Sequence, residues 1–66
     1  MRIRLNGEAR EVPAGCTVAE LLEELRLRSE QVAVERNGEL VTRAAHRETQ
    51  LAEEDAVEVV TLVGGG

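Results

Sequence analysis

The sequence closes on a glycine run whose one reactive group is a carboxylate. A strand-like segment, 56–62, leads directly into Val63, Gly64, Gly65 and Gly66. Glycine has no Cβ, so such a thread fits a narrow channel and adopts almost any backbone conformation. The α-carboxylate of Gly66 is ionised at neutral pH. We therefore expect a tail that presents Gly66 to the active site of another protein.

The other residues that could do chemistry have no activating or co-ligating residue near them in the sequence. Cys16 is the only cysteine, and no histidine, lysine or second cysteine adjoins it to activate a thiolate, so we expect it to pack as a small apolar group. His46 is the only histidine and lies in a polar segment, where we expect a solvated loop side chain. No catalytic triad, phosphate-binding loop or zinc-ligand spacing occurs. The sequence predicts no catalytic, cofactor-binding or metal-ligating residue, and a protein that is not an enzyme.

Composition narrows the choice of partners. The 66 residues suit one small domain, with eight arginines, no lysine, thirteen acidic residues and a net charge of −5. This charge and the absence of aromatic residues argue against nucleic acid or an anionic membrane and favour a basic protein surface. A lone cysteine, no leader and no long apolar stretch predict a cytoplasmic protein, and we expect a monomer when it is free.

Hydrophobic alternation and two Asn-Gly pairs predict the strands. Asn6-Gly7 and Asn37-Gly38 are typical of two-residue hairpin turns, which require positive φ at both positions. The residues expected to face inward from the flanking strands are Met1, Ile3, Leu5, Val32 and Val34. The expected strands cover residues 2–5, 9–12, 31–36, 39–42 and 56–62.

One helix of about ten residues is expected after Cys16. Thr17 and Glu20 form a capping-box pattern. An apolar stripe follows at helical spacing: Val18, Leu21, Leu22 and Leu25. Arg26 and Arg28 are expected near the helix end, where cations favour the helix dipole. Residues 43–50 predict a loop with one turn of helix, and Leu51 is expected to anchor it.

These elements predict an α+β domain over residues 1–62 and a flexible tail over 63–66. The helix covers one face of a four- to five-stranded sheet. In the last strand Val57 and Val59 face the helix, which leaves Glu58, Val60 and Leu62 on the other face. Exposed apolar side chains on a small protein often mark a partner site, so we expect partner contacts at Val60, Leu62 and Val63.

The motifs together resemble a known family. They are Ile3-Arg4-Leu5-Asn6-Gly7-Glu8, Thr17-Val18-Ala19-Glu20-Leu21-Leu22, Asn37-Gly38-Glu39-Leu40-Val41 with Arg43, and Val57-Glu58-Val59-Val60 before the glycine tail. The chain resembles ubiquitin-like β-grasp proteins, with a mixed sheet, and most closely the ThiS-like sulfur carriers of thiamine biosynthesis. It departs from the family at Glu54-Asp55, where Gly-Asp is common, and this departure leaves the geometry of that turn open.

The resemblance implies a carrier that partners act upon. A ThiF-like adenylating enzyme, using ATP and Mg²⁺, would join Gly66 to AMP. Sulfur from a donor such as a cysteine desulfurase would then replace AMP and leave a thiocarboxylate. A ThiG-like thiazole synthase would accept that sulfur. The glycine tail, with Gly64 and Gly65, would span at most roughly 13–14 Å into the partner's site.

Three other functions share some of these features. A MoaD-like small subunit of molybdopterin synthase has the same fold and tail, but such chains carry extra residues where this one has only 27–30. A ubiquitin-like modifier would begin with the same tail chemistry. A non-covalent binding module would leave the glycines without a role.

Overall fold

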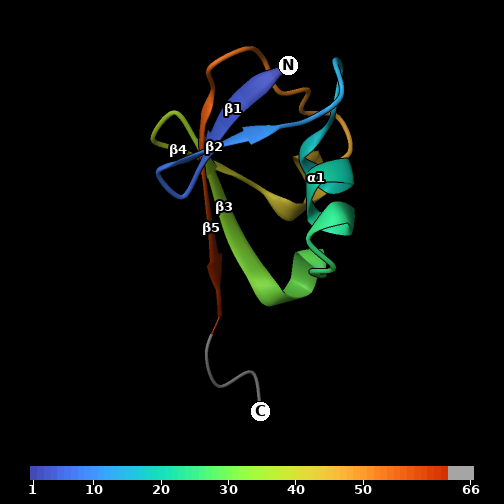
Figure 1. Ribbon diagram of the computed structural model, residues 1–66. Coiled ribbons are helices and arrows are strands. Elements are labelled where there is room, and N and C mark those ends of the chain that lie inside the picture. Colours follow the sequence, from blue (N-terminus) through green and yellow to red (C-terminus); the bar gives the residue numbers. More distant parts are fainter. Residues whose placement is uncertain (63–66) are drawn as a thin grey trace.

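A computed structural model describes residues 1–62 as a five-stranded sheet with one α-helix on one face (Figure 1). The elements are β1 (Arg2–Leu5), β2 (Glu8–Glu11), α1 (Val18–Glu24), β3 (Val32–Arg36), β4 (Glu39–Val41) and β5 (Ala56–Thr61), with short 3-10 helices η1 (Ser29–Gln31) and η2 (Arg43–Ala45). The strand order is β2-β1-β5-β3-β4, with β1 and β5 parallel and the other neighbours antiparallel. The predicted ubiquitin-like β-grasp fold is confirmed.

The hairpins use the turns that their Asn-Gly pairs favour. Asn6 and Gly7 have φ of 51° and 86°, and Asn37 and Gly38 have φ of 52° and 86°. Positive φ at both central positions matches the right-handed twist of the flanking strands. Strand ends differ slightly from expectation, because Gln31 belongs to η1 and leaves β3 to begin at Val32.

The core lies between α1 and the inner face of the sheet. The largest fully buried side chains are Ile3, Val18, Leu21, Leu22, Val34 and Val57. This confirms both the predicted helix stripe and the inward residues of the strands. Leu51 is also buried, and its backbone N–H donates to the carbonyl of Cys16 at 2.8 Å, so it anchors the segment after η2 as expected.

The helix begins as predicted but ends early. The Thr17 hydroxyl accepts the Glu20 N–H at 3.1 Å, and the Glu20 carboxylate accepts the Thr17 N–H at 2.9 Å. At the other end the Leu27 N–H donates to the Leu22 carbonyl and the Arg26 N–H to that of Glu23, which is a Schellman motif. The expected ten-residue helix is wrong: α1 has seven residues, and Arg26 lies beyond it.

Replacing Arg26 with glycine is expected to stabilise the fold. Arg26 has a φ of 60°, a left-handed conformation that costs an L-residue about 1–2 kcal/mol and glycine nothing. Part of that gain is offset by the greater freedom of glycine in the unfolded chain, which leaves about 1 kcal/mol. For a domain of this size the melting temperature would rise by roughly 4–8 °C. Arg26→Ala keeps the Cβ and should show no such rise; equal melting temperatures for both variants would contradict the assignment of strain.

The turn before β5 also contains a residue in the left-handed conformation. Glu54 has a φ of 67°, so it occupies the left-handed region that favours glycine. Its carboxylate pairs with Arg2 at 2.8 Å, and its N–H donates to the Arg2 carbonyl at 2.7 Å. The turn therefore keeps a glycine-type geometry, with an ion pair to β1 at its rim.

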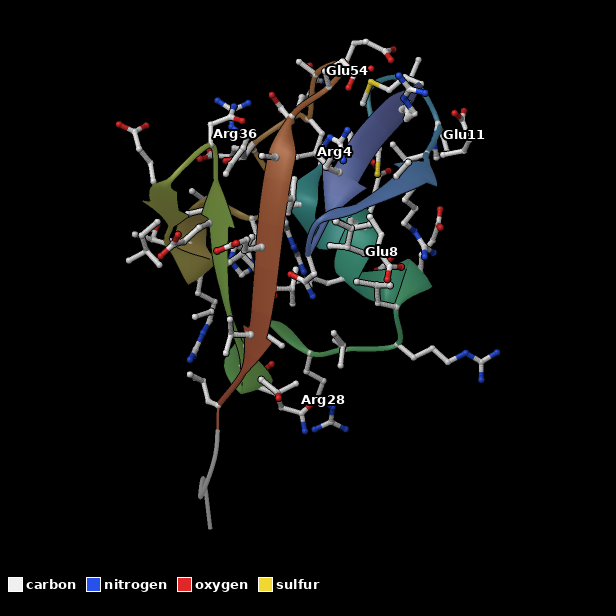
Figure 2. All side chains as sticks on the ribbon, turned by 60° about the vertical axis from the view of Figure 1, so that its left-hand side comes forward. Arg4, Glu8, Glu11, Arg28, Arg36 and Glu54 are labelled. Carbon is white, nitrogen blue, oxygen red and sulfur yellow. The ribbon has the colours of Figure 1, made fainter. Side chains whose placement is uncertain are left out.

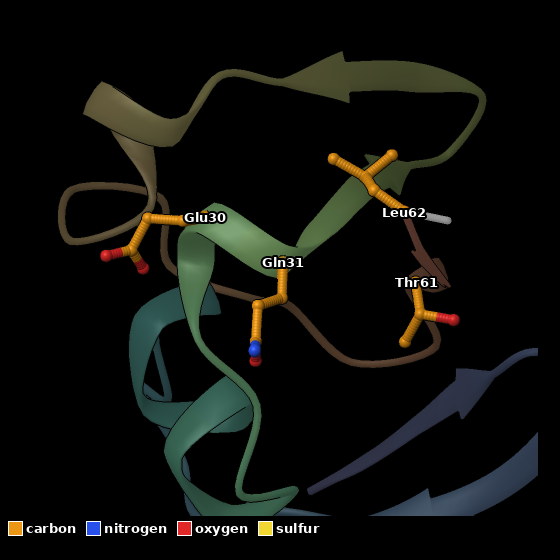
Figure 3. A pocket seen from close by; sticks show the side chains of 4 residues that line it. All are labelled: Glu30, Gln31, Thr61 and Leu62. Carbon is orange, nitrogen blue, oxygen red and sulfur yellow. The ribbon is translucent and has the colours of Figure 1, made fainter. Parts of the chain in front are cut away.

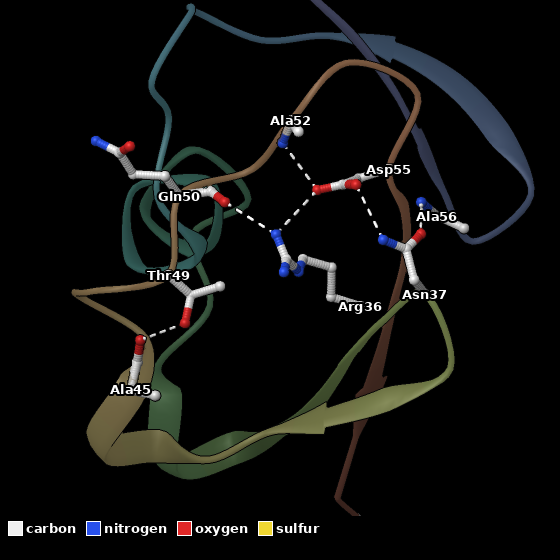
Figure 4. A network of polar contacts seen from close by, with 8 residues as sticks. All are labelled: Arg36, Asn37, Ala45, Thr49, Gln50, Ala52, Asp55 and Ala56. Carbon is white, nitrogen blue, oxygen red and sulfur yellow. Dashed lines mark hydrogen bonds and ion pairs between the residues drawn. The ribbon is translucent and has the colours of Figure 1, made fainter.

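Asp55 holds this turn against the second hairpin (Figure 4). It is buried, and its carboxylate accepts from the Ala52 N–H at 2.8 Å, the Asn37 amide at 3.0 Å and the Arg36 guanidinium at 3.4 Å. Burial raises the pKa of Asp55, but the hydrogen bonds and the nearby arginine outweigh it and hold the pKa below its ordinary value. The sequence identified 53–55 only as a charged turn and missed this network.

The fold should lose stability in acid through Asp55. A lowered pKa in the folded state means that the folded protein binds this proton more weakly than the unfolded chain. The contribution of Asp55 to the free energy of unfolding is therefore complete at neutral pH. It is lost as the pH falls below about 4 and through the pKa of Asp55 in the folded protein. Asp55→Asn should lower the free energy of unfolding by about 1–3 kcal/mol at neutral pH. It should also weaken the dependence of that free energy on pH in the acid range. Urea unfolding across this pH range checks it; an unchanged acid slope would contradict the role.

Candidate functional site

The two Asn-Gly turns fix β5, the strand that leads to the tail. The Asn6 side chain accepts the Val59 N–H at 2.9 Å and donates to the Val59 carbonyl at 3.2 Å. The Asn37 side chain accepts the Ala56 N–H at 2.9 Å. These bonds continue the sheet pairing beyond the strands on both sides of β5. Both asparagines therefore position the strand as well as forming turns, a second role that the sequence did not reveal.

One face of β5 is open. Val57 is fully buried and Val59 packs against the core, whereas Val60 and Leu62 are 58% and 56% exposed. This confirms the predicted assignment of faces. In Figure 2, β5 lies at the front of the sheet with α1 behind it.

A third exposed apolar side chain extends this face. Leu40 is 65% exposed on β4 and pairs in register with Glu35 of β3, which in turn pairs with Glu58. Directly opposed residues of a sheet share a face, so Leu40 lies on the open side. We call Leu40, Val60 and Leu62 the apolar patch. The alternation of β4 could have placed Leu40 there, but only the strand order shows that β3 alone separates Leu40 from β5.

The last described residue is tied to the body. The Leu62 N–H donates to the Gln31 carbonyl at 2.8 Å. Glu30, Gln31, Thr61 and Leu62 line an open pocket of about 600 Å³ beside it (Figure 3). The chain therefore leaves the sheet from a fixed point against η1. The expected tail residues Val63, Gly64, Gly65 and Gly66 lie outside the described residues.

His46 holds η1 in place, and the expectation of a solvated loop side chain is wrong. The residue is 3% exposed, with Nδ1 3.0 Å from the Ser29 hydroxyl and Nε2 3.2 Å from the Val41 carbonyl. A carbonyl can only accept, so Nε2 donates to it, and in the neutral ring Nδ1 accepts from Ser29. The polar sequence around His46 did not indicate its burial, because the groups that hold the ring belong to η1 and β4.

Cys16 has the environment of a packing residue. It is 3% exposed, and its thiol donates to the Thr17 carbonyl at 3.4 Å. Burial, together with the charges of Glu20 and Glu24, raises the pKa of the Cys16 thiol. Each of these effects disfavours the thiolate, which is the reactive form. The expected apolar packing of Cys16 is confirmed.

The described part of the chain offers little else for chemistry. No group of three or more His, Cys, Asp or Glu side chains within residues 1–62 is arranged to hold a metal ion. No helix in the same range is long and apolar enough to cross a membrane. Of the predicted site residues, the structure thus places Val60 and Leu62 together on the open face, next to the point where the tail begins.

Comparison with known proteins identifies relatives along the whole chain. A family model described as "ThiS family" matches residues 3–66. A thiazole synthase of Magnetococcus marinus is 46% identical over 66 residues, which are all of this chain and 20% of that protein. The sulfur carrier protein ThiS of Bacillus subtilis is 38% identical over 50 residues, 76% of each chain. The chain spans about a fifth of the length of the thiazole synthases that it matches.

A solved structure matches this protein in fold and over the full length of the chain. The crystal structure of the thiamine biosynthesis protein ThiS from Geobacter metallireducens superposes with a TM-score of 0.82 at 38% identity, and the match covers 100% of both chains. The family model covers nearly the entire sequence, including the glycine run that follows β5. The chain belongs to the ThiS family.

Proposed function

We propose that this chain is a sulfur carrier protein of thiamine biosynthesis, which delivers sulfur for the thiazole ring as a thiocarboxylate at Gly66. Relatives named for thiazole synthesis and for sulfur carriage, at 46% and 38% identity, support this pathway over molybdopterin synthesis. The short connection between α1 and β3 supports it too, since it contains little beyond η1.

One observation carries the proposal: the central strand leads to a fixed exit point beside exposed apolar side chains. Leu62 is tied to Gln31, and the sequence continues with Val63 and three glycines. A partner that docks on the apolar patch therefore receives these residues from a defined origin. Fixing the origin lowers the entropic cost of placing a reacting group.

The chemistry has two acyl steps. A carboxylate oxygen of Gly66 attacks the α-phosphate of ATP, and pyrophosphate leaves. The outer sulfur of a persulfide on the donor then attacks the carbonyl carbon of the acyl adenylate, AMP leaves, and an acyl disulfide forms. A thiol of the partner proteins then attacks the donor's sulfur of that S–S bond, which forms a disulfide with the donor cysteine and releases the thiocarboxylate. An acyl adenylate is a far better acyl donor than a carboxylate, which is why activation must come first.

The partners supply the catalysis in this proposal. The ThiF-like enzyme holds ATP and Mg²⁺, a donor such as a cysteine desulfurase provides sulfur, and the thiazole synthase consumes it. This chain acts as carrier and co-substrate, works as a monomer between encounters and resides in the cytoplasm, where its unpaired cysteine stays reduced.

Intact mass spectrometry tests the proposal. The chain is incubated with ATP, Mg²⁺, an adenylating enzyme and a sulfur donor. We expect a mass gain equal to replacement of one oxygen by sulfur. Adducts of this chain on other proteins would instead indicate a modifier, and no mass change with active partners would indicate a binding module.

Replacing Cys16 should leave sulfur transfer intact. The buried thiol has a raised pKa and no part in the proposed route. Cys16→Ser is expected to form thiazole at near the parent yield. It should lose stability on the order of 1 kcal/mol, because a hydroxyl replaces a buried thiol. Thiazole yield and thermal melting check the two parts separately; loss of transfer in a folded Cys16→Ser variant would contradict the route.

A further inference from the structure

Both asparagines of the sequence stand directly before a glycine. They are Asn6 and Asn37, and each occupies the first position of a two-residue hairpin turn. Glycine has no side chain to hinder its backbone nitrogen, so this nitrogen can attack the side-chain amide of the preceding asparagine. Asparagine is accordingly among the thermolabile residues of proteins. Both turns are therefore candidate sites of deamidation, a modification that replaces the side-chain amide by a carboxylate.

The reaction at Asn6 needs water and no partner protein. The Gly7 nitrogen attacks Cγ of Asn6, its proton passes through water to Nδ2, and Nδ2 leaves as ammonia while a succinimide ring closes. Water then adds to one of the two carbonyl carbons of the ring and breaks a C–N bond, which leaves aspartate or isoaspartate at position 6. Asn6 and Gly7 are both exposed, so water reaches the site. Because Nδ2 is the leaving group, the hydrogen bond that it makes in the folded protein must break.

The two asparagines differ in what binds this leaving nitrogen. Nδ2 of Asn6 donates to the Val59 carbonyl at 3.2 Å, in an exposed hydrogen bond. Nδ2 of Asn37 donates at 3.0 Å to the carboxylate of Asp55, which is 8% exposed (Figure 4). A hydrogen bond to a carboxylate is roughly twice as strong as one to a neutral carbonyl. The charge of Asp55 also opposes the negative charge that develops as the Gly38 nitrogen loses its proton, so the fold protects Asn37 more than Asn6.

We infer that Asn6 is a site of spontaneous deamidation in the folded protein, and that loss of its amide frees β5 on the side of β1. The Asn6 amide accepts the Val59 N–H at 2.9 Å and donates to the Val59 carbonyl. A carboxylate can only accept, so that carbonyl would lose its donor and face a negative oxygen. Isoaspartate would also lengthen the backbone of a turn that is set by φ values of 51° and 86°. The modified chain therefore loses a restraint on the strand that leads to the tail.

Peptide mapping by mass spectrometry measures the rates at both asparagines in the same molecule. The full chain is incubated at physiological temperature and pH, once folded and once in urea. In urea both residues precede glycine in an unfolded chain and should convert at similar rates. In the folded protein Asn6 should convert about 5- to 10-fold faster than Asn37, the ratio expected for a neutral against a charged acceptor. Equal rates in the folded protein, faster conversion of Asn37, or no conversion of Asn6 while the urea sample is consumed would each overturn the inference.

Asp55→Asn tests the protection of Asn37. It replaces the carboxylate that holds the leaving nitrogen, so deamidation of Asn37 should accelerate about 5- to 10-fold, toward the rate of Asn6. The matched control Glu53→Gln removes an exposed charge from the same turn and should leave both rates near those of the parent. Asn6 is the internal reference for stability, because unfolding would speed both residues equally. Acceleration of both residues by one factor, or of neither, would contradict protection by Asp55.

The consequence for β5 is measured on the product. Protein deamidated at Asn6 alone is separated from the parent by ion exchange, through its additional negative charge. It should melt roughly 4–8 °C below the parent, the shift expected from one lost hydrogen bond. Asn6→Asp keeps the normal backbone and should also melt below the parent, because it lacks the same donor. Parent-like melting of both proteins would show that the Asn6 amide does not hold β5.

Discussion

Removal of Gly65 and Gly66 is expected to abolish adenylation and thiocarboxylate formation while leaving the melting temperature unchanged. The deleted residues follow β5 and Leu62, so no described strand pairing or core contact is touched. The reacting carboxylate would move to Gly64, two residues nearer the body, and would fall roughly 7 Å short of the partner's reaction centre. Intact mass spectrometry after incubation with the adenylating system measures the loss.

A one-methyl change provides the matched control for reach. Gly66→Ala keeps the length of the tail but adds a Cβ in a channel shaped for glycine, so thiocarboxylate formation should slow sharply without loss of folding. A truncated chain that is still converted at the parent rate would contradict the role of Gly66.

Replacing Val60 with aspartate is expected to weaken partner binding by a few kcal/mol, the scale of a buried interface anchor. Val60 is 58% exposed on the open face, two residues from the exposed Glu58 of the same strand. The domain should lose no more than about 1 kcal/mol, the span of strand propensities. Titration calorimetry against the adenylating enzyme and the thiazole synthase gives the affinity, and thermal melting gives the stability.

Two controls separate charge from shape. Val60→Thr keeps the β-branch and should bind far better than Val60→Asp. Ala14→Asp adds the same charge at an exposed loop before α1 and should leave affinity nearly unchanged. Parent-like binding by Val60→Asp, or collapse of its fold, would count against the open face as a docking surface.

Local patterns were enough to predict most of the fold. The capping box, the helix stripe and the Asn-Gly turns each depend on contacts between residues close in sequence, and each is observed. The alternation in β5 also predicted the buried Val57 and the exposed Val60. Such signals are readable because backbone geometry fixes which neighbours share a face.

What the sequence missed depends on contacts between distant segments. The His46 ring is held by η1 and β4, and the Asp55 carboxylate gains two of its three donors from the second hairpin. The facing of Glu35 and Glu58 follows from strand order, which no local pattern specifies. Helix length was overestimated because Arg26, a residue with good helix propensity, adopts the left-handed position that ends α1.

The role of the tail as sulfur carrier is tested most directly by locating the transferred sulfur within the chain. The parent protein is charged with label from isotopic cysteine by the reconstituted adenylating enzyme and desulfurase, then fragmented in a mass spectrometer. We expect label only in the C-terminal fragment, at Gly66, and loss of that label when thiazole synthase forms product. Label at Cys16, or product formed with no label ever reaching Gly66, would contradict the claim that the tail carries the sulfur.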